Sequence, residues 1–237
     1  GFTTGTVTPT SVSEDKADLA TLNGTTGISL ATTNITVTDQ VNKSEADTIN
    51  AYTTGQVVLN SASMTVSELA TVEALNDSEM KFADNGAISV SDAATLANAN
   101  TINAYTTGQV TLTSVSDTVA NITSIDGLTT TEVTMAGATV SVSDAATLAN
   151  ANAINGFTTG TVTLTSASDT VSNLATLAAI NNAEVTIAGA AISVSDAATL
   201  ANANTINAYT TGQVTLTSVS DTVSNLATLA AIDNAEV

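Results

Sequence analysis

The residues of this chain that could most readily do chemistry are aspartates repeated at a fixed spacing. Each follows a serine, and together they form two rows: Asp92, Asp144 and Asp196 in one, and Asp117, Asp169 and Asp221 in the other. Stacked carboxylates repel one another unless a cation lies between them, which makes the rows candidate calcium ligands. Aspartate is also a favoured helix N-cap and turn residue.

The sequence around these aspartates favours the capping role. The chain contains neither the glycine–aspartate nonapeptide of calcium-binding rolls nor an EF-hand loop. We therefore predict that the aspartates cap helices and turns, and we assign no metal-ligating and no cofactor-binding residue. Calcium binding is the alternative.

The chain has few residues that are suited to catalysis. The chain has no histidine, cysteine or arginine, and its lysines are Lys16, Lys43 and Lys81, at non-equivalent positions. A nucleophile and its base would have to come from serine, lysine or carboxylate side chains. An active site interrupts a repeat, whereas this pattern continues unbroken where the copies are cleanest. We predict that the protein is not an enzyme and assign no catalytic residue.

Threonines form a second regular set. Thr106, Thr107, Thr111 and Thr113, with their copies, are expected to place hydroxyl rows on the outer face of a sheet. Such a surface is similar to the ice-binding face of some antifreeze proteins. Threonine is also simply a good strand former, and alternate half-repeats interrupt the rows with an Ala-Gly pair. The structural interpretation is preferred, with ice binding as an alternative.

The charge balance limits the partners. There are 22 acidic residues against three lysines, the net charge is −19, and no basic side chain follows Lys81. Binding to nucleic acid requires lysine and arginine to neutralise phosphates, and anionic membranes repel such a chain. No apolar run is long enough to span a bilayer. We predict no nucleic-acid partner and no membrane insertion.

The elements that must position these residues belong to a repeat of about 52 residues. An aromatic-Thr-Thr-Gly motif recurs with its glycine at Gly5, Gly55, Gly108, Gly160 and Gly212, and Ala87–Val119 is identical to Ala191–Val223. A constant period of this length predicts stacked supersecondary units. We expect one repeat array over residues 1–237, an excerpt of a longer array, with units at 1–50, 51–103, 104–155, 156–207 and 208–237.

Each repeat divides into two similar halves. In the first, Val-Thr-Leu-Thr from Val162 alternates like a half-buried strand, and Ser168-Asp169 is expected to cap a helix that ends at Asn181-Asn182. The second half has an Ala-Gly bend between two short strands and a cap at Ser195-Asp196. The expected apolar stripes are Val171, Leu174, Leu177 and Ile180 in the first half and Ala197, Leu200, Ala203 and Ile206 in the second.

These halves predict an α/β solenoid: a parallel β-sheet on one side, short α or 3₁₀ helical segments on the other, and about 26 residues per coil within a 52-residue double repeat. Val162 and Leu164 should point into a shared interior. The first repeats are less regular, because Pro9 stands where later copies have leucine and Met64 replaces a recurrent aspartate.

The segments Val115-Ser-Asp-Thr-Val-Ala-Asn-Ile122 and Ile88-Ser-Val-Ser-Asp-Ala-Ala-Thr-Leu96 resemble a repeat of the Val-Ser-Asp-Thr-Ala-Ala-Asn-Ile type. This repeat occurs in very large secreted or cell-surface proteins of bacteria, marine cyanobacteria among them. The resemblance implies an extracellular or cell-surface structural segment that acts as a spacer, a surface layer or a self-associating filament body. Its partners would be copies of itself, stacked end to end or laterally. The alternative is an adhesin-type module that binds calcium, glycan or ice.

Overall fold

The computed structural model describes residues 5–75, 78–128, 132–180 and 184–232. The chain divides into two compact units, unit 1 over Gly1–Thr113 and Leu128–Thr134, and unit 2 over Ser114–Gly127 and Met135–Val237. Strand β5 (Val110–Asp117) contributes its first half to unit 1 and its second half to unit 2.

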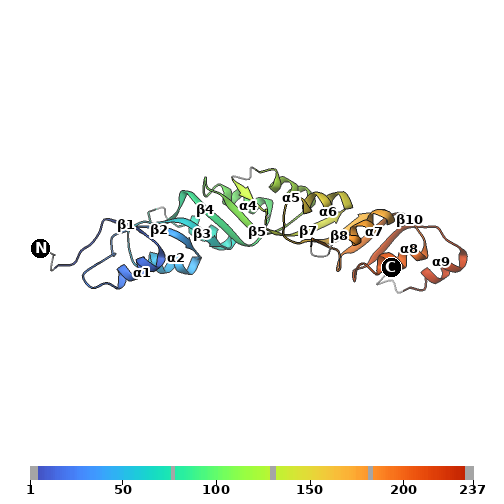
Figure 1. The fold of residues 1–237 in the computed structure, drawn as a ribbon, viewed down its shortest axis with the longest axis horizontal. Helices are drawn as coiled ribbons and strands as arrows, with labels where there is room; N and C mark the ends of the chain where they lie inside the picture. Colours follow the sequence, from blue (N-terminus) through green and yellow to red (C-terminus); the bar gives the residue numbers. More distant parts are fainter. Residues whose placement is uncertain (1–4, 76–77, 129–131, 181–183, 233–237) are drawn as a thin grey trace. The chain divides into compact units, whose positions relative to one another are not determined.

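Both units alternate strands with short helices in chain order (Figure 1). Besides the first half of β5, unit 1 holds β1 (Ser11–Glu14), α1 (Lys16–Gly24), β2 (Asn34–Val41), α2 (Lys43–Asn50), β3 (Val57–Met64), α3 (Val66–Glu73), β4 (Met80–Ala94), α4 (Leu96–Asn103) and β6 (Val133–Thr134). Besides the second half of β5, unit 2 holds α5 (Val119–Asp126), β7 (Thr139–Ala146), α6 (Leu148–Asn155), β8 (Val162–Asp169), α7 (Val171–Ala179), β9 (Val185–Thr186), β10 (Ala191–Ala198), α8 (Leu200–Asn207), β11 (Val214–Val219) and α9 (Val223–Leu229).

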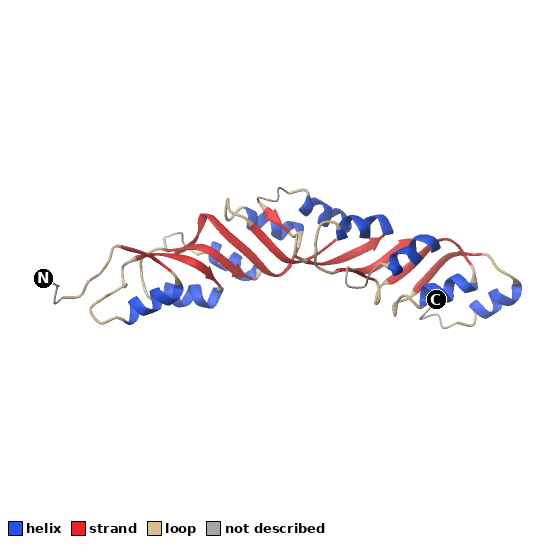
Figure 2. Cartoon of the chain, in the orientation of Figure 1, coloured by secondary structure: helices blue, strands red, loops and turns tan. Residues whose placement is uncertain are grey.

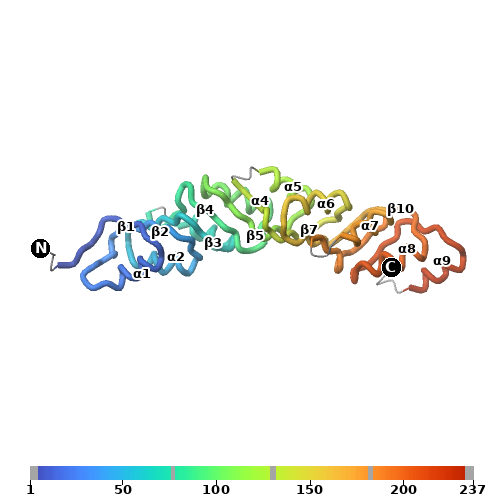
Figure 3. Tube along the Cα trace, viewed as in Figure 1, coloured from blue at the N-terminus to red at the C-terminus, as the bar shows by residue number. Residues whose placement is uncertain are grey.

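Within each unit the strands form a parallel sheet, and the helices lie along one of its faces (Figure 2). In unit 1 the order is β1-β2-β3-β4, and in unit 2 it is β7-β8-β10-β11, with β9 also pairing with β8. Each strand and the helix that follows it form one coil, and consecutive coils lie side by side (Figure 3). The predicted α/β solenoid architecture is therefore confirmed.

The core of each unit lies between its sheet and its helices. Val162 and Leu164, predicted to point inward, are 0% and 1% exposed, and Leu174 and Leu177 of α7 are equally buried. Helices of eight or nine residues are marginal in water, so they form mainly because their apolar side chains pack on the sheet. Both expected stripes hold only in part. Val171 and Ile180 of the first are half-buried. In the second, Ala203 and Ile206 are buried, Leu200 is half-buried and Ala197 is an exposed strand residue.

The helices begin later than predicted. The N-cap of α7 is Thr170, not Ser168-Asp169, and the N-cap of α8 is Thr199, not Ser195-Asp196. Each threonine hydroxyl accepts a hydrogen bond from the backbone N–H three residues later. Helix α7 ends at Ala179, and its expected end at Asn181-Asn182 lies outside the described residues.

Coil length alternates around the predicted mean of 26 residues. The N-caps Thr147, Thr170 and Thr199 lie 23 and then 29 residues apart. The short coils, such as β8–α7, contain the Thr-Thr-Gly motif and an unbroken strand. In unit 2 the long coil β9–β10–α8 contains two strand segments separated by the predicted bend, whereas in unit 1 the long coil before α4 has the single strand β4. The described helices are all too short, and not apolar enough, to cross a membrane.

Candidate functional site

The chemistry-bearing side chains gather where one coil meets the next. The best-defined contact is made by the Thr-Thr-Gly turns, which are residues 53–55, 106–108, 158–160 and 210–212 in the described chain. In unit 2 the Thr158 hydroxyl donates to the carbonyl of Ala138 in the preceding coil at 2.6 Å, and it accepts from the N–H of Gly160 at 2.9 Å. Thr210 makes the same pair of bonds to Ala190 and Gly212.

The glycine of each turn is required by the close approach of two backbones. A Cβ placed on Gly160 would lie 2.2 Å from the Ala138 carbonyl oxygen, and one on Gly212 would lie 2.3 Å from that of Ala190. Real side chains do not tolerate such contacts, so glycine is needed where backbones approach this closely. In unit 1, Gly55 and Gly108 face the same restriction at 2.5 and 2.4 Å.

The turns correct the threonine prediction for Thr106, whereas Thr107 and Thr113 are exposed and Thr111 is half-buried. Thr106, expected on the outer face, is 7% exposed and donates to the Gly86 carbonyl at 2.6 Å. Thr113 is exposed, but its hydroxyl donates to the Val90 carbonyl at 2.7 Å. Both hydroxyls thus donate to backbone carbonyls of the preceding coil, and the buried Thr106 is hydrogen-bonded, as buried polar groups usually are.

The aspartates form the second contact between coils. Six of them, here called the corner aspartates, accept a hydrogen bond from the first helical N–H of the preceding coil: Asp39 from Lys16, Asp92 from Val66, Asp144 from Val119, Asp169 from Leu148, Asp196 from Val171 and Asp221 from Leu200. The distances lie between 2.8 and 3.0 Å. The predicted capping role is thus correct in kind but wrong in the helix that is capped.

Two local geometries bring the corner aspartates to this position. In the long coils a register shift between Val194 and Ala197 takes Asp196 off the strand ladder and turns it toward α7. In the short coils Asp169 stands at the strand end, where its second carboxylate oxygen accepts from the N–H of Thr170 and the amide of Asn173, both at 2.8 Å. Asp117, whose row includes Asp169, receives the same two bonds from Thr118 and Asn121.

These hydrogen bonds set the charge state of the carboxylates. Burial alone would raise the pKa of Asp169, but the hydrogen bonds from Leu148, Asn173 and Thr170 outweigh it and hold the pKa below its ordinary value. The pKa of Asp221 is lowered by the equivalent hydrogen bonds, that from the Leu200 backbone first. A carboxylate at a helix N-terminus also interacts favourably with the helix dipole.

The corner aspartates do not assemble into a metal site in the described chain. No group of three or more histidine, cysteine, aspartate or glutamate side chains comes together there. The carboxylate oxygens bind backbone and amide N–H groups instead, at distances typical of charge-assisted hydrogen bonds.

One corner departs from this pattern. At the aspartate position of β3 stands Met64, which is 1% exposed and packs inside unit 1. The preceding helix, α2, begins with a capping box in which Asn42 and Glu45 bind each other's backbone N–H groups. Its first residue, Lys43, pairs with Asp47 one turn later at 2.6 Å.

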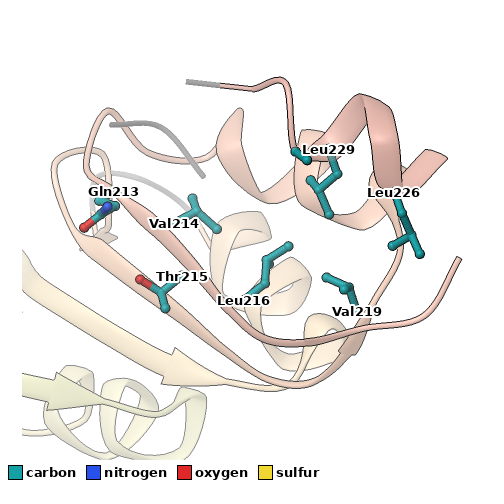
Figure 4. A pocket seen from close by; sticks show the side chains of 8 residues that line it. Gln213, Val214, Thr215, Leu216, Val219, Leu226 and Leu229 are labelled. Carbon is teal, nitrogen blue, oxygen red and sulfur yellow. The ribbon is translucent and has the colours of Figure 1, made fainter. Parts of the chain in front are cut away.

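An apolar groove lies between β11 and α9 in the last described coil. The groove has a volume of about 670 Å³ and is lined by Gln213, Val214, Thr215, Leu216, Val219, Leu226, Leu229 and Ala230. Side chains from the strand and the helix point toward one another across it (Figure 4). Val219 and Val223 are 43% and 85% exposed, whereas Ala167, which precedes Val219 by one repeat, is 0% exposed.

The first and last parts of the array differ in their basic residues. Lys16 of α1 reaches across to Glu45 of α2 at 2.8 Å and to the carbonyl of Gln40. The hydrogen bond to Glu45 raises the pKa of Lys16 and lowers that of Glu45. No lysine occurs in unit 2, so this kind of inter-helix pair belongs to unit 1 alone.

Sequence reasoning missed the structural role of the Thr-Thr-Gly turns, although the signal was present. The glycine follows Thr-Thr in every copy, while the residue after it is Thr or Gln and the residue three positions before it is Tyr or Phe. A glycine that is required in every repeat indicates a turn or a close backbone approach. Comparison with known proteins adds no relative, since no family model, no curated protein and no solved structure matches the chain.

Proposed function

We propose that this chain is a structural repeat segment of a large extracellular or cell-surface bacterial protein, in which it acts as a spacer. The observation that carries the proposal is the use of the polar side chains. Thr158 and Asp169 are hydrogen-bonded to the preceding coil, and Asn173 is hydrogen-bonded to Asp169 of its own coil, so these polar side chains are used within the stack.

The repetition of these contacts supports the same conclusion. Thr158 and Thr210, one repeat apart, make the same bonds, and so do Asp169 and Asp221. A catalytic site would be expected to make at least one coil differ from the others. The corner aspartates of unit 2 make this contact in short and in long coils alike. An extracellular location is proposed from the sequence resemblance and from the acidic composition, which favours solubility in salt-rich surroundings.

The spacer role predicts that length grows with the number of coils. One extra copy of residues 140–191 inserted after residue 191 lies entirely within unit 2. Spin labels on Ser116→Cys and Thr215→Cys, in a chain with no other cysteine, flank the insertion. Neighbouring parallel strands lie about 4.8 Å apart, so two added coils should increase the label separation by about 10 Å.

Double electron–electron resonance measures that separation. The uninserted chain with the same two labels is the matched control. An unchanged distance, or a broad distribution typical of an unfolded insert, would contradict the spacer proposal, because the added coils would then not have joined the existing stack.

A further inference from the structure

One Thr-Thr-Gly turn of unit 1 departs from the repeat and carries side chains suited to a ligand. A hollow of about 310 Å³ lies beside this turn and is lined by Asp84, Asn103, Ala104, Tyr105, Thr106 and Thr107, all within unit 1. We propose that this hollow, here called the Asp84 hollow, binds one neutral sugar ring of the pyranose type. This binding goes beyond the spacer role and does not depend on it.

The carboxylate of Asp84 distinguishes this turn from the other described turns. In each turn the N–H of the second threonine donates to a carbonyl of the preceding coil, and here Thr107 donates to Asp84 at 2.6 Å. At the other described turns the residue with that carbonyl is Ala31, Ala136 or Ala188. The coil of Asp84 is also longer, since its flanking N-caps, Thr65 and Thr95, are 30 residues apart, against 29 in the later long coils. Departures from an otherwise consistent pattern are expected at functional sites.

The aromatic residue of this turn has a second ring packed against it. Tyr105 stacks on Phe82, with 6.2 Å between the ring centroids and 9° between the ring planes. Phe82 is 4% exposed, whereas Tyr105 is half-buried and lines the hollow. At the other described turns the residue equivalent to Phe82 has no ring: it is Leu30, Met135 or Ile187. Tyr105 therefore offers a supported, flat surface on which the C–H groups of a sugar ring can pack.

Two polar side chains accompany this ring in the hollow. The side chain of Asp84 is 93% exposed, and its Oδ1 lies 3.7 Å from Nζ of Lys81. Asn103 ends α4, and within the described residues its amide makes no hydrogen bond, whereas the equivalent Asn50 donates to Glu79 at 3.2 Å. A carboxylate accepts hydrogen bonds and an amide both donates and accepts them, so the two groups match neighbouring hydroxyls of a sugar.

The charges around the hollow favour a neutral ligand. Lys81 lies beside Asp84, so the carboxylate already has a cationic neighbour, and this lysine stands where later copies have Thr134 and Thr186. Burial, and then the charge of Glu73, raise the pKa of Tyr105, so its hydroxyl stays protonated at neutral pH and can donate to a sugar oxygen. The net charge of −19 disfavours anionic ligands.

The rim of the hollow is held in place by the turn itself. The Asp84 carbonyl accepts from both the N–H and the hydroxyl of Thr107, each at 2.6 Å, and Thr106 donates to the Gly86 carbonyl at the same distance. A rim that is already fixed loses little conformational freedom when a ligand binds. Small-molecule sites have volumes of about 300–1,000 Å³, so this hollow matches one sugar ring better than a longer chain of sugars.

Fluorine NMR on the full chain tests the proposal at Tyr105 itself. The chain has three tyrosines, and Tyr52→Phe leaves only Tyr105 and Tyr209; phenylalanine already stands at the equivalent Phe157. Labelled with 3-fluorotyrosine, this variant gives one signal for each remaining tyrosine, and Tyr105→Phe assigns them. The probes are methyl β-D-glucopyranoside, methyl β-D-galactopyranoside and methyl α-D-mannopyranoside. At least one should shift the Tyr105 signal saturably, while the Tyr209 signal, the internal control, should not move.

Two substitutions in the Tyr52→Phe chain test the polar groups. Asp84→Ala introduces the residue found at the other described turns, so the fold should be kept, and the sugar should bind about tenfold more weakly because a charge-assisted hydrogen bond is lost. Asn103→Ala should weaken binding several-fold. Asp126→Ala, in unit 2, removes one charge elsewhere and should leave the affinity unchanged. Circular dichroism checks that each variant is folded.

The opposite results overturn the proposal. A Tyr105 signal that none of the three sugars shifts would show that the hollow does not bind a sugar ring. Equal shifts of the Tyr105 and Tyr209 signals, or full affinity in Asp84→Ala, would show that the departing residues do not form the site. A shift with tetramethylammonium chloride but not with the sugars would identify a site for organic cations instead. None of these outcomes changes the spin-label separation, so the spacer role is tested separately.

Discussion

Two junctions of the same kind, one in each unit, have different residues at the end of the strand, where the chain turns into the next helix. Each joins a long coil to the short coil that follows: α2 to β3 in unit 1, and α6 to β8 in unit 2. Both have a Thr-Thr-Gly turn whose threonine donates to the preceding coil, Thr53 at 2.7 Å and Thr158 at 2.6 Å. The corner itself is a buried Met64 in unit 1 and the hydrogen-bonded Asp169 in unit 2.

The comparison separates what every junction requires from what can vary. The glycine and threonine of the turn occur at both junctions, because two backbones come too close there for any other arrangement. The aspartate corner is not required for a helix to begin, because Met64 replaces it in unit 1, and α2 and α6 each carry a capping box of their own. The backbone ladder and the turn therefore define the stack, and the aspartates add stability to it.

The largest expected effect comes from the feature that both junctions share. Gly160→Ala places a methyl group 2.2 Å from the Ala138 carbonyl, so the coils must separate locally. We expect a loss of about 3 kcal/mol in the free energy of unfolding, in line with overpacked sites. Gly189→Ala is the matched control, because no atom lies within 4 Å of the new methyl group. Urea unfolding of both variants measures the difference, and equal stabilities would contradict the account of the turn.

A smaller effect is expected when the unit 2 corner is converted to the unit 1 kind. Asp169→Met leaves the N–H groups of Leu148 and Thr170 and the amide of Asn173 without their carboxylate. The expected loss is about 1–2 kcal/mol, since some of these donors reach water. Asp126→Asn, at the exposed end of α5, serves as the control for removal of one negative charge. A stability equal to that of the parent chain would show that the two corners are interchangeable.

The smallest expected effect is a pH dependence of the unfolding free energy that only the corner with Asp169 contributes. The pKa of Asp169 is lowered in the folded state, so its contribution is present above the unfolded value, near 3.9, and is lost as the pH falls through the folded value. The difference in unfolding free energy between the parent chain and Asp169→Met should therefore be full at neutral pH and shrink below about pH 4. Met64→Leu, in the corner without a titratable group, should show a difference that does not change with pH.

The architecture could be predicted because the same strand and helix patterns recur in every repeat. Alternation in Val-Thr-Leu-Thr predicts one buried face, and the recurrence of Leu174 and Leu177 predicts the helix that covers it. The residue at which each helix begins was harder to predict. Asp169 and Thr170 are adjacent and both favour N-caps, and only the backbone geometry shows that the threonine fills that position.

The contacts between coils could not be derived from one coil alone. Whether Asp196 caps its own helix or the preceding one depends on the register shift that turns it off the ladder. The burial of Thr106 depends on how closely Gly108 approaches the coil before it. Both are relations between residues more than 20 positions apart, whereas periodicity reports only which face of one element is apolar.

The alternation of 23-residue and 29-residue spacings between N-caps restricts how an array of this kind can change its length. Loss or gain of a single coil would place two short coils or two long coils side by side. The register shift in the strand of a long coil would then no longer lie between two short coils. Loss or gain of a complete pair restores every neighbour. We therefore expect duplication and deletion in the gene to occur in steps of about 52 codons. The identical segments Ala87–Val119 and Ala191–Val223 lie two such steps apart.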